Sequence, residues 1–194
     1  MTIEVENVSK AFGAETVLED VSLMLDSDSM VACTGPAGCG KTTLLRIILG
    51  LETPDRGKVN LLGDYKYDRV NAGVVFQEDR LCEDFSAVVN VAMVSSRLSE
   101  RVAAEELSKL LPEDALARPV RELSPVQRRR TALVRACIIP TDVLLLDEPF
   151  AGMNEEEMAQ SVRYLRETAR HKPVLIAARS YDGLEFCRQM ELAR

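Results

Sequence analysis

The most informative segment of the chain is a glycine-rich octapeptide that reads Gly35-Pro36-Ala37-Gly38-Cys39-Gly40-Lys41-Thr42. It fits the P-loop pattern G-x-x-x-x-G-K-[ST], in which glycines let backbone N–H groups curl around a phosphate. An apolar run at residues 30–34 precedes it, and a helical pattern at residues 42–49 follows it. Because a strand, a glycine-rich loop and a helix in this order open an α/β unit, we expect an α/β fold. Lys41 is expected to contact the β- and γ-phosphates, and Thr42 to bind Mg²⁺.

A second segment supplies the acidic half of such a site. The apolar run at residues 143–146 is typical of a buried parallel strand, and it ends in Asp147 and Glu148. One carboxylate at this position can hold Mg²⁺, and the next can polarise an attacking water. Strands also end in solvated acids, so the pair is informative mainly together with the glycine-rich loop. In that combination Asp147 is expected to bind the metal and Glu148 to act in hydrolysis.

The remaining pattern predicts the elements around this core. Residues 1–25 alternate apolar and polar side chains, which predicts two antiparallel strands joined by a turn at Gly13. Further strands are expected at residues 59–62, 72–76 and 174–178. Helices are expected at residues 88–94, 102–111 up to Pro112, 125–137 and 155–170. The helical stretch between the two α/β portions predicts a subdomain.

Composition limits the classes of protein to consider. The 194 residues carry 24 Lys and Arg against 31 Asp and Glu, and the formal net charge of −7 disfavours a nucleic-acid binder. For the run Arg128-Arg129-Arg130 we therefore expect a solvated helix face rather than a nucleic-acid patch. The five cysteines form no CxxC pair, which disfavours a zinc site or disulfide scaffold, and His171 is expected to be exposed and idle. We expect no signal peptide and no membrane span.

Several segments in the same order together resemble the ATP-binding subunits of ABC transporters, members of the P-loop NTPase superfamily. The loop continues through Thr43 into Leu44-Leu45-Arg46 and Leu49-Gly50-Leu51, as it does in that family. Downstream, the similar segments are Phe76-Gln77, Leu123-Ser124-Pro125-Val126-Gln127 and Asp147-Glu148-Pro149-Phe150. The resemblance covers nearly the whole chain. A weaker likeness, in residues 77–81 and 91–92, is to importers of the nitrate, sulfonate or taurine type.

The resemblance implies roles for individual residues. ATP is expected on the P-loop from Gly35 to Thr43, with Phe12, 23 residues before Gly35, stacked on adenine. By itself Phe12 would be interpreted as a core or turn aromatic, and only its spacing from Gly35 favours the adenine contact. Gln77 is expected to sense Mg²⁺ and the attacking water while contacting a membrane partner, although alone it would be interpreted as a surface amide. Ser124, in the signature segment, is expected at the γ-phosphate of the opposite subunit, and Tyr181 at a switch position where the family has histidine.

The resemblance also implies an architecture and partners. The expected fold is a P-loop NTPase core with a mainly parallel sheet, an N-terminal antiparallel β subdomain and a short helical insert subdomain. Residues 1–194 are expected to form a single ABC-type ATP-binding domain, with the helical subdomain at approximately residues 78–135. The expected partners are a second ATP-binding subunit in a homo- or heterodimer and a transmembrane permease, without nucleic acid. The chain would then be cytoplasmic and peripheral on the inner face of the cell membrane.

Three departures from the family pattern shape the functional hypothesis. Pro125 and Val126 replace two glycines of the signature, Asn154 stands where the family has aspartate, and Tyr181 replaces the switch histidine. Proline has no N–H to donate and a phenol does not become a cation near pH 7. We therefore expect a slow, Mg²⁺-dependent ATPase that powers a transporter, and we expect an importer because no span is fused to the chain. The alternative is a non-transport ABC-type nucleotide switch with little hydrolysis, and a small-molecule P-loop kinase is the third candidate.

Overall fold

The computed structural model describes residues 1–63 and 70–192, and its contacts divide the chain into two compact units. The sheet unit contains the described residues of 1–72, 142–147 and 171–194. The helical unit contains residues 73–141 and 148–170. The chain therefore leaves the sheet unit after its N-terminal third, returns for one short strand, and returns again for its C-terminal part.

The sheet unit begins with three antiparallel strands in the order β2-β1-β4. These strands are β1 (Thr2–Phe12), β2 (Glu15–Leu25) and β4 (Arg56–Leu62). Val5 of β1 stands opposite Leu23 on one side and Val59 on the other, so apolar side chains line one face. Gly13 makes the turn between β1 and β2 with φ 62°, which confirms the predicted hairpin.

The parallel strands of the sheet unit run in the order β6-β7-β3-β8. They are β3 (Met30–Thr34), β6 (Val143–Asp147), β7 (Val174–Ala178) and β8 (Arg188–Glu191). All five residues of β6 are buried, as expected for a central parallel strand. The α/β class with a mainly parallel sheet is thus confirmed. Strand β8 was not expected, because its residues are polar and largely exposed.

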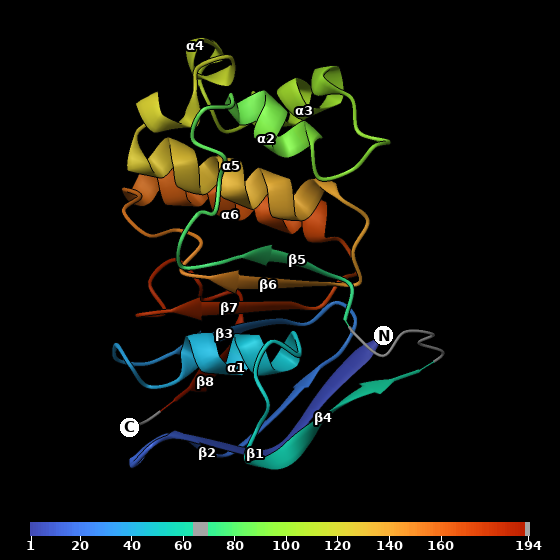
Figure 1. Cartoon of the computed structure of the whole chain (residues 1–194), viewed down its shortest axis with the longest axis vertical. Coiled ribbons are helices and arrows are strands. Elements are labelled where there is room, and N and C mark those ends of the chain that lie inside the picture. The colour runs from blue at the N-terminus through green and yellow to red at the C-terminus, as the bar shows by residue number, and fades with distance from the viewer. Residues whose placement is uncertain (64–69, 193–194) are drawn as a thin grey trace. The chain divides into compact units, whose positions relative to one another are not determined.

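Helix α1 (Lys41–Ile48) lies between the parallel strands and the antiparallel strands of the sheet unit (Figure 1). Its buried side chains join those of both sheets in one apolar core. Fully buried members of that core include Ile3, Val8, Leu25, Leu44, Val143, Leu145 and Leu175. This core fixes the start of α1, and therefore the loop before it, against the carboxyl ends of the parallel strands.

The helical unit contains the short strand β5 and six helical segments. Their bounds are β5 (Ala72–Val75), α2 (Ala87–Ala92), α3 (Glu100–Leu107), α4 (Glu113–Leu116), the 3₁₀ turn η1 (Val120–Glu122), α5 (Pro125–Ile138) and α6 (Glu155–Ala169). Helices α5 and α6 lie side by side, and α2 and α3 pack against α5 (Figure 1). Among the described residues, no helix is long and apolar enough to cross a bilayer.

The prediction of a helix over residues 102–111, ended by Pro112, is confirmed over residues 102–107 and wrong beyond them. Helix α3 ends at Leu107, and the Ser108 hydroxyl at its C-terminal cap donates to the carbonyl of Glu105. Two turns follow, and they bury Leu110 and Leu111 without a further helical turn. Pro112 instead precedes α4 as its N-terminal cap residue. The apolar spacing was therefore correct for burial but not for helical structure.

The N-terminus of α6 is closed by a capping box. Asn154 Oδ1 accepts a hydrogen bond from the Glu157 N–H at 2.9 Å, and Glu157 Oε2 accepts one from the Asn154 N–H at 2.9 Å. Asparagine and aspartate cap helices about equally well. The replacement of the expected aspartate by Asn154 is therefore neutral for this helix.

This cap gives a stability prediction for Asn154. The variant Asn154→Ala removes the acceptor for the Glu157 N–H and should lower the free energy of unfolding by about 1 kcal/mol. The control Asn154→Asp keeps the acceptor and should stay within about 0.5 kcal/mol of the original chain. Urea unfolding followed by circular dichroism measures both, and equal stability of Asn154→Ala and the original chain would contradict the capping role.

Candidate functional site

The P-loop of the sheet unit has a backbone that requires glycine at two points. Gly35 has φ 149° and Gly40 has φ 96°, both in the region that side chains avoid. A Cβ on Gly35 would clash with the carbonyl oxygen of Leu192, and one on Gly40 would clash with that of Val17. The loop is therefore a close-packed backbone curl, as a phosphate cradle requires.

Lys41 places a buried ammonium inside this curl. Its Nζ donates to the carbonyl of Gly35 at 2.6 Å and to that of Pro36 at 2.9 Å, and the residue is only 8% exposed. The cap of α1, Gly40, offers no side-chain acceptor, and the first turn holds no acidic residue. The first N–H groups of α1 thus point to a position where an anion is favoured by the helix dipole and by the nearby charge.

Thr42 and Asp147 meet at the same place although 105 residues separate them. Thr42 Oγ1 donates to Asp147 Oδ2 at 2.6 Å, and Asp147 is buried. A hydroxyl and a carboxylate are the hard oxygen ligands that Mg²⁺ prefers. The described residues contain no group of three or more His, Cys, Asp or Glu that could hold a metal ion. Because Mg²⁺ usually keeps several waters and binds one or two carboxylates together with phosphates, the Thr42–Asp147 pair suits this ion.

The thiols near the P-loop are buried and carry no disulfide. All five cysteines are free, and Cys33 and Cys39 are both buried in the sheet unit. Burial, followed by the nearby Cys39, raises the pKa of the Cys33 thiol to about 12. Cys33 is therefore a neutral thiol at neutral pH and adds no negative charge beneath the phosphate position.

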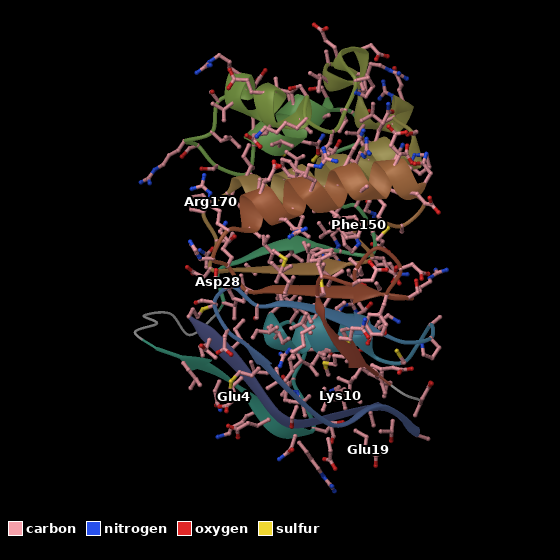
Figure 2. The ribbon with its side chains drawn as sticks, turned by 180° about the vertical axis from the view of Figure 1, so that it is seen from behind. Glu4, Lys10, Glu19, Asp28, Phe150 and Arg170 are labelled. Atoms are coloured by element: carbon pink, nitrogen blue, oxygen red, sulfur yellow. The ribbon has the colours of Figure 1, made fainter. Side chains whose placement is uncertain are left out.

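Phe12 lies at the end of β1 with half of its surface exposed. Lys10 Nζ is 5.2 Å from the centre of its ring, and Figure 2 shows Lys10 on the antiparallel sheet. The ammonium is held by Glu52 at 2.9 Å and Asp55 at 3.2 Å, and the bond to Glu52 raises the Lys10 pKa. Sequence reasoning missed Lys10, because its partners lie more than 40 residues away.

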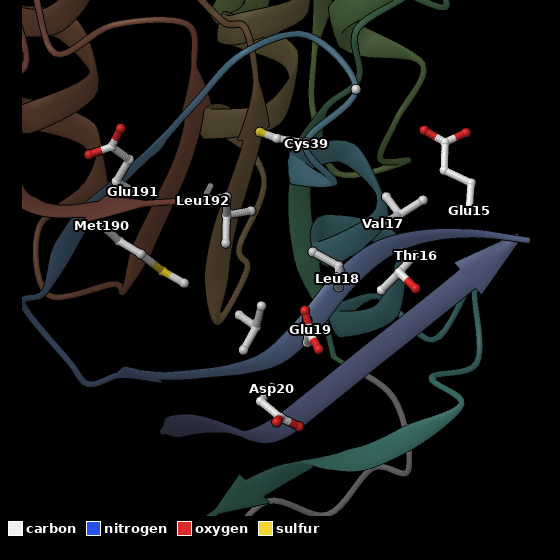
Figure 3. Close-up of a pocket in the computed structure, with 12 residues that line it drawn as sticks. Glu15, Thr16, Val17, Leu18, Glu19, Asp20, Cys39, Met190, Glu191 and Leu192 are labelled. Carbon is white, nitrogen blue, oxygen red and sulfur yellow. The ribbon is translucent and has the colours of Figure 1, made fainter. Parts of the chain in front are cut away.

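A cavity of about 680 Å³ lies beside the P-loop in the sheet unit (Figure 3). It is lined by residues 15–21 of β2, by Gly38 and Cys39, and by residues 190–192 at the end of β8. Four of the lining side chains are acidic: Glu15, Glu19, Asp20 and Glu191. Carboxylates repel phosphate, so this cavity is less favourable for an anion than the P-loop curl.

The sheet unit also carries Tyr181, three residues after the end of β7. The side chain is half-buried, and the main-chain carbonyl of Tyr181 accepts a hydrogen bond from the Leu184 N–H at 2.8 Å. Four of the predicted features, namely Phe12, the P-loop, Asp147 and Tyr181, thus belong to one compact unit.

The other predicted residues belong to the helical unit. Gln77 is exposed directly after β5, and Glu148 adopts a left-handed backbone with φ 49°. Ser124 caps α5 in a capping box, in which its Oγ accepts from the Gln127 N–H at 3.2 Å and Gln127 Oε1 accepts from the Ser124 N–H at 2.9 Å. Pro125 occupies the first helical position, as predicted.

One expectation about charged residues is wrong. Arg129 is 8% exposed and Arg130 7%, so the arginine run is not a solvated face. Their guanidinium groups are buried because backbone carbonyls of distant segments accept their hydrogen bonds. His171 is exposed, as expected, and its Nδ1 lies 2.6 Å from Asp28 Oδ1 on the surface.

Comparisons with known proteins identify the family and the fold of the chain. Residues 18–151 match the family described as ABC transporter. The sulfate/thiosulfate import ATP-binding protein of Pseudomonas syringae is 43% identical over 180 residues, which cover 85% of this chain and 55% of that protein. The protein of the same name from Thermosynechococcus vestitus is 37% identical over 98% of this chain and 60% of its own length. The chain thus spans little more than half the length of these curated relatives.

Solved structures share the fold. A putative ABC transporter ATP-binding protein from Pyrococcus furiosus has a TM-score of 0.84 over 99% of this chain and 98% of its own, at 22% identity. A dimeric bacterial ABC transporter cassette has a TM-score of 0.80 over 99% of this chain and 97% of its own, at 27% identity. The same cassette has been solved in a post-hydrolysis state with ADP and Pi. With its P-loop, its Thr42–Asp147 pair and the family match across residues 18–151, the chain belongs to the ABC transporter family of ATP-binding proteins.

Proposed function

We propose that this chain binds ATP with Mg²⁺ and hydrolyses it slowly, and that hydrolysis powers import by an ABC transporter. The observation that carries the proposal is the hydrogen bond between Thr42 and Asp147 at the open N-terminus of α1. Lys41 adds a buried positive charge next to Thr42 in the chain. A hydroxyl, a carboxylate, an ammonium and uncapped helix N–H groups are the set that a metal-bound triphosphate needs.

In this proposal the phosphates lie on the P-loop, and Lys41 changes its partners on binding. Its ammonium now donates to the neutral carbonyls of Gly35 and Pro36. Phosphate oxygens carry charge and are stronger acceptors than carbonyls, so the ammonium donates to them instead. The phosphate-binding residues are Gly35, Pro36, Ala37, Gly38, Cys39, Gly40, Lys41, Thr42 and Thr43. The Phe12 ring stacks on adenine and is held in place by Lys10.

The residues that we assign to Mg²⁺ are Thr42, Asp147 and Gln77. They would offer a hydroxyl, a carboxylate and an amide oxygen, all of which suit a small hard cation. An ion held by these residues would supply positive charge next to the phosphate oxygens. Thr42 and Asp147 share a hydrogen bond, so their oxygens are already held together.

Glu148 is the residue that we assign as general base. Its carboxylate takes the proton of the attacking water, and the Gln77 amide orients that water. The φ of 49° at Glu148 is a conformation that residues other than glycine adopt rarely. Such strain occurs where the surrounding structure holds a side chain in a required direction, which supports a functional role for Glu148.

The start of α5 supports slow turnover. In a head-to-tail dimer of the kind that the sequence resembles, Ser124 would face the γ-phosphate on the partner subunit. Its Oγ is engaged as a helix cap, and Pro125 has no N–H to offer. A missing charge-assisted hydrogen bond costs about 1.5–3 kcal/mol, which is roughly a ten- to hundredfold loss. Tyr181 can donate one hydrogen bond but supplies no positive charge near pH 7.

The partners follow from the relatives. Import is supported by curated relatives named for sulfate and thiosulfate import, rather than for nitrate, sulfonate or taurine. Pairing with a second ATP-binding subunit is supported by the dimeric cassette that shares the fold. We propose that residues 1–194 act as one ABC-type ATP-binding domain with a helical subdomain at about 78–135. The domain would lie on the inner face of the cell membrane through a permease subunit.

A second candidate is a non-transport nucleotide switch that closes on ATP with negligible hydrolysis. The capping box at Ser124 favours it, because the serine and the first helical position are used for folding rather than for phosphate contact. This candidate keeps Lys41, Thr42 and Asp147 as the ATP-binding residues. The two candidates therefore differ in turnover and not in affinity.

Removal of the P-loop ammonium tests nucleotide binding. Lys41→Ala deletes the cation that faces the phosphates and should weaken ATP binding by about a hundredfold or more. Lys58→Ala, at an exposed lysine of β4, is the matched control and should bind as the original chain does. Isothermal titration calorimetry measures both, and unchanged affinity in Lys41→Ala would contradict both candidate functions.

Removal of the proposed base separates hydrolysis from switching. Glu148→Gln should lower ATP turnover by about a hundredfold or more, with ATP affinity retained and the ATP-bound dimer accumulating. Glu167→Gln, on the exposed surface of α6, serves as the control. Phosphate release and size-exclusion chromatography report the two effects. If the original chain dimerises on ATP without turnover, the switch is favoured, and if Glu148→Gln changes neither turnover nor dimerisation, hydrolytic transport is contradicted.

Restoration of the signature tests the cause of slow turnover. The double variant Pro125→Gly/Val126→Gly restores an N–H and removes bulk, and its ATPase rate should rise about tenfold. The variant Pro125→Ala/Val126→Ala restores the N–H but keeps a Cβ, so it separates hydrogen bonding from close approach. Steady-state ATPase assays compare the three chains. An unchanged rate in both variants would mean that the signature does not limit turnover.

A further inference from the structure

Two arginines of α5 are bound to the loop of residues 76–80, which carries Gln77. Arg129 Nη1 donates to the Phe76 carbonyl at 2.6 Å, and Arg129 Nη2 donates to the Gln77 carbonyl at 2.5 Å. Arg129 Nε lies 3.2 Å from the carboxylate of Asp79, which balances the buried charge. The fork of one guanidinium therefore holds the backbone on both sides of the peptide that joins Phe76 to Gln77.

Arg135 continues the same arrangement further along α5. Its Nη2 donates to the Asp79 carbonyl and its Nη1 to the Arg80 carbonyl, both at 2.8 Å. Two arginines of one helix thus donate hydrogen bonds to four of the five carbonyls in residues 76–80. Within the loop, the Arg80 guanidinium also lies 4.0 Å from the centre of the Phe76 ring. The loop is irregular in structure but is anchored to α5.

The neighbouring arginines make different contacts. Arg130 donates to the carbonyls of Leu110 and Glu157, and so joins α5 to the segment after α3 and to α6. Arg128 Nε donates to the Val120 carbonyl in η1 at 3.0 Å. The contact with the Gln77 loop is therefore specific to Arg129 and Arg135 among the described arginines of α5.

We propose that Arg129 and Arg135 are positioning residues that fix Gln77 to the signature helix, so that this loop and Ser124 move as one body. The inference rests on the proposed function, in which Gln77 orients water and Ser124 faces a partner's nucleotide. Ser124 is the cap of α5 and Arg129 lies just over one turn later in the same helix. If the signature segment moves together with α5, Gln77 therefore moves with it, because the loop is hydrogen-bonded to that helix.

The loop is held in place by the strength of charge-assisted hydrogen bonds from the guanidinium groups to its carbonyls. An irregular loop has no ladder of its own to satisfy its carbonyls, and a guanidinium supplies several donors in a fixed plane. Loss of one such fork removes the charged donor from the Phe76 and Gln77 carbonyls and raises local opening by about ten- to a hundredfold. The opened loop keeps Gln77 but no longer holds it at a fixed place.

The test compares Arg129→Gln and Arg129→Lys with the control Arg128→Gln in the full chain. Arg129→Gln should lower kcat about tenfold while the KM for ATP changes less than about threefold, because the P-loop is unaltered. Arg129→Lys keeps the charge and one donor and should recover part of kcat. Arg128→Gln should match the original chain. Peptides spanning residues 76–80 should exchange amide hydrogen about tenfold faster in Arg129→Gln, with α5 unchanged.

Unchanged kcat and unchanged exchange in Arg129→Gln would overturn the proposal. If amide hydrogens exchange faster throughout α5 in Arg129→Gln, the substitution has destabilised the helix itself. The kcat and the exchange of residues 76–80 are then measured in Arg135→Lys. If neither kcat nor exchange changes in Arg135→Lys, the proposal is overturned. Hydrogen exchange needs no nucleotide, so it tests the anchoring even if the original chain proves unable to hydrolyse ATP. An original chain without turnover would overturn the proposed ATPase and leave the anchoring to be decided by exchange alone.

Discussion

The curl of the P-loop around the Lys41 ammonium is the constraint on which the sheet unit depends. A buried ammonium is tolerated only where oxygen acceptors surround it, and the Gly35 and Pro36 carbonyls lie 2.6 and 2.9 Å away. The backbone presents these carbonyls with Gly35 at φ 149°, and the Leu192 carbonyl packs where a Cβ would lie. The end of β8 is itself fixed, because the Leu192 N–H donates to the Thr34 carbonyl at 2.8 Å. The loop, the strand before it and the last described strand are thus one packed arrangement.

The register of the parallel strands extends this constraint to the acidic residue. Ala177 of β7 pairs with Cys33 of β3 on one side and with Asp147 of β6 on the other. Asp147 is therefore level with the end of β3, and Thr42 can reach it across the intervening strand. A slip of one residue in β6 would turn the carboxylate to the opposite face of the sheet. Such a slip would also break the hydrogen bond from Thr42 Oγ1 to Asp147 Oδ2.

Sequence patterns predicted the features that depend on local or motif-level information. The hairpin at Gly13, the strands around the P-loop, the helix at Pro125 and the meeting of Thr42 with Asp147 are of this kind. The burial of Arg129 could not be predicted, because its carbonyl acceptors lie 52 and 53 residues away and leave no trace in side-chain type. The left-handed backbone conformation of Glu148 could likewise not be predicted, because the residue type alone does not indicate a positive φ.

Two departures from the family pattern, Pro125 and Asn154, are compatible with the helices that begin there. Ser124 and Asn154 both complete capping boxes, so helices α5 and α6 begin without an uncapped first turn. The cost of Pro125 would therefore fall on contacts that α5 makes outside the chain, while Lys41, Thr42 and Asp147 keep the family pattern. In a homodimer both nucleotides would meet the altered signature. In a heterodimer whose partner has an intact signature, the nucleotide on this chain's P-loop would be fully contacted, so the choice of partner would set the rate of turnover.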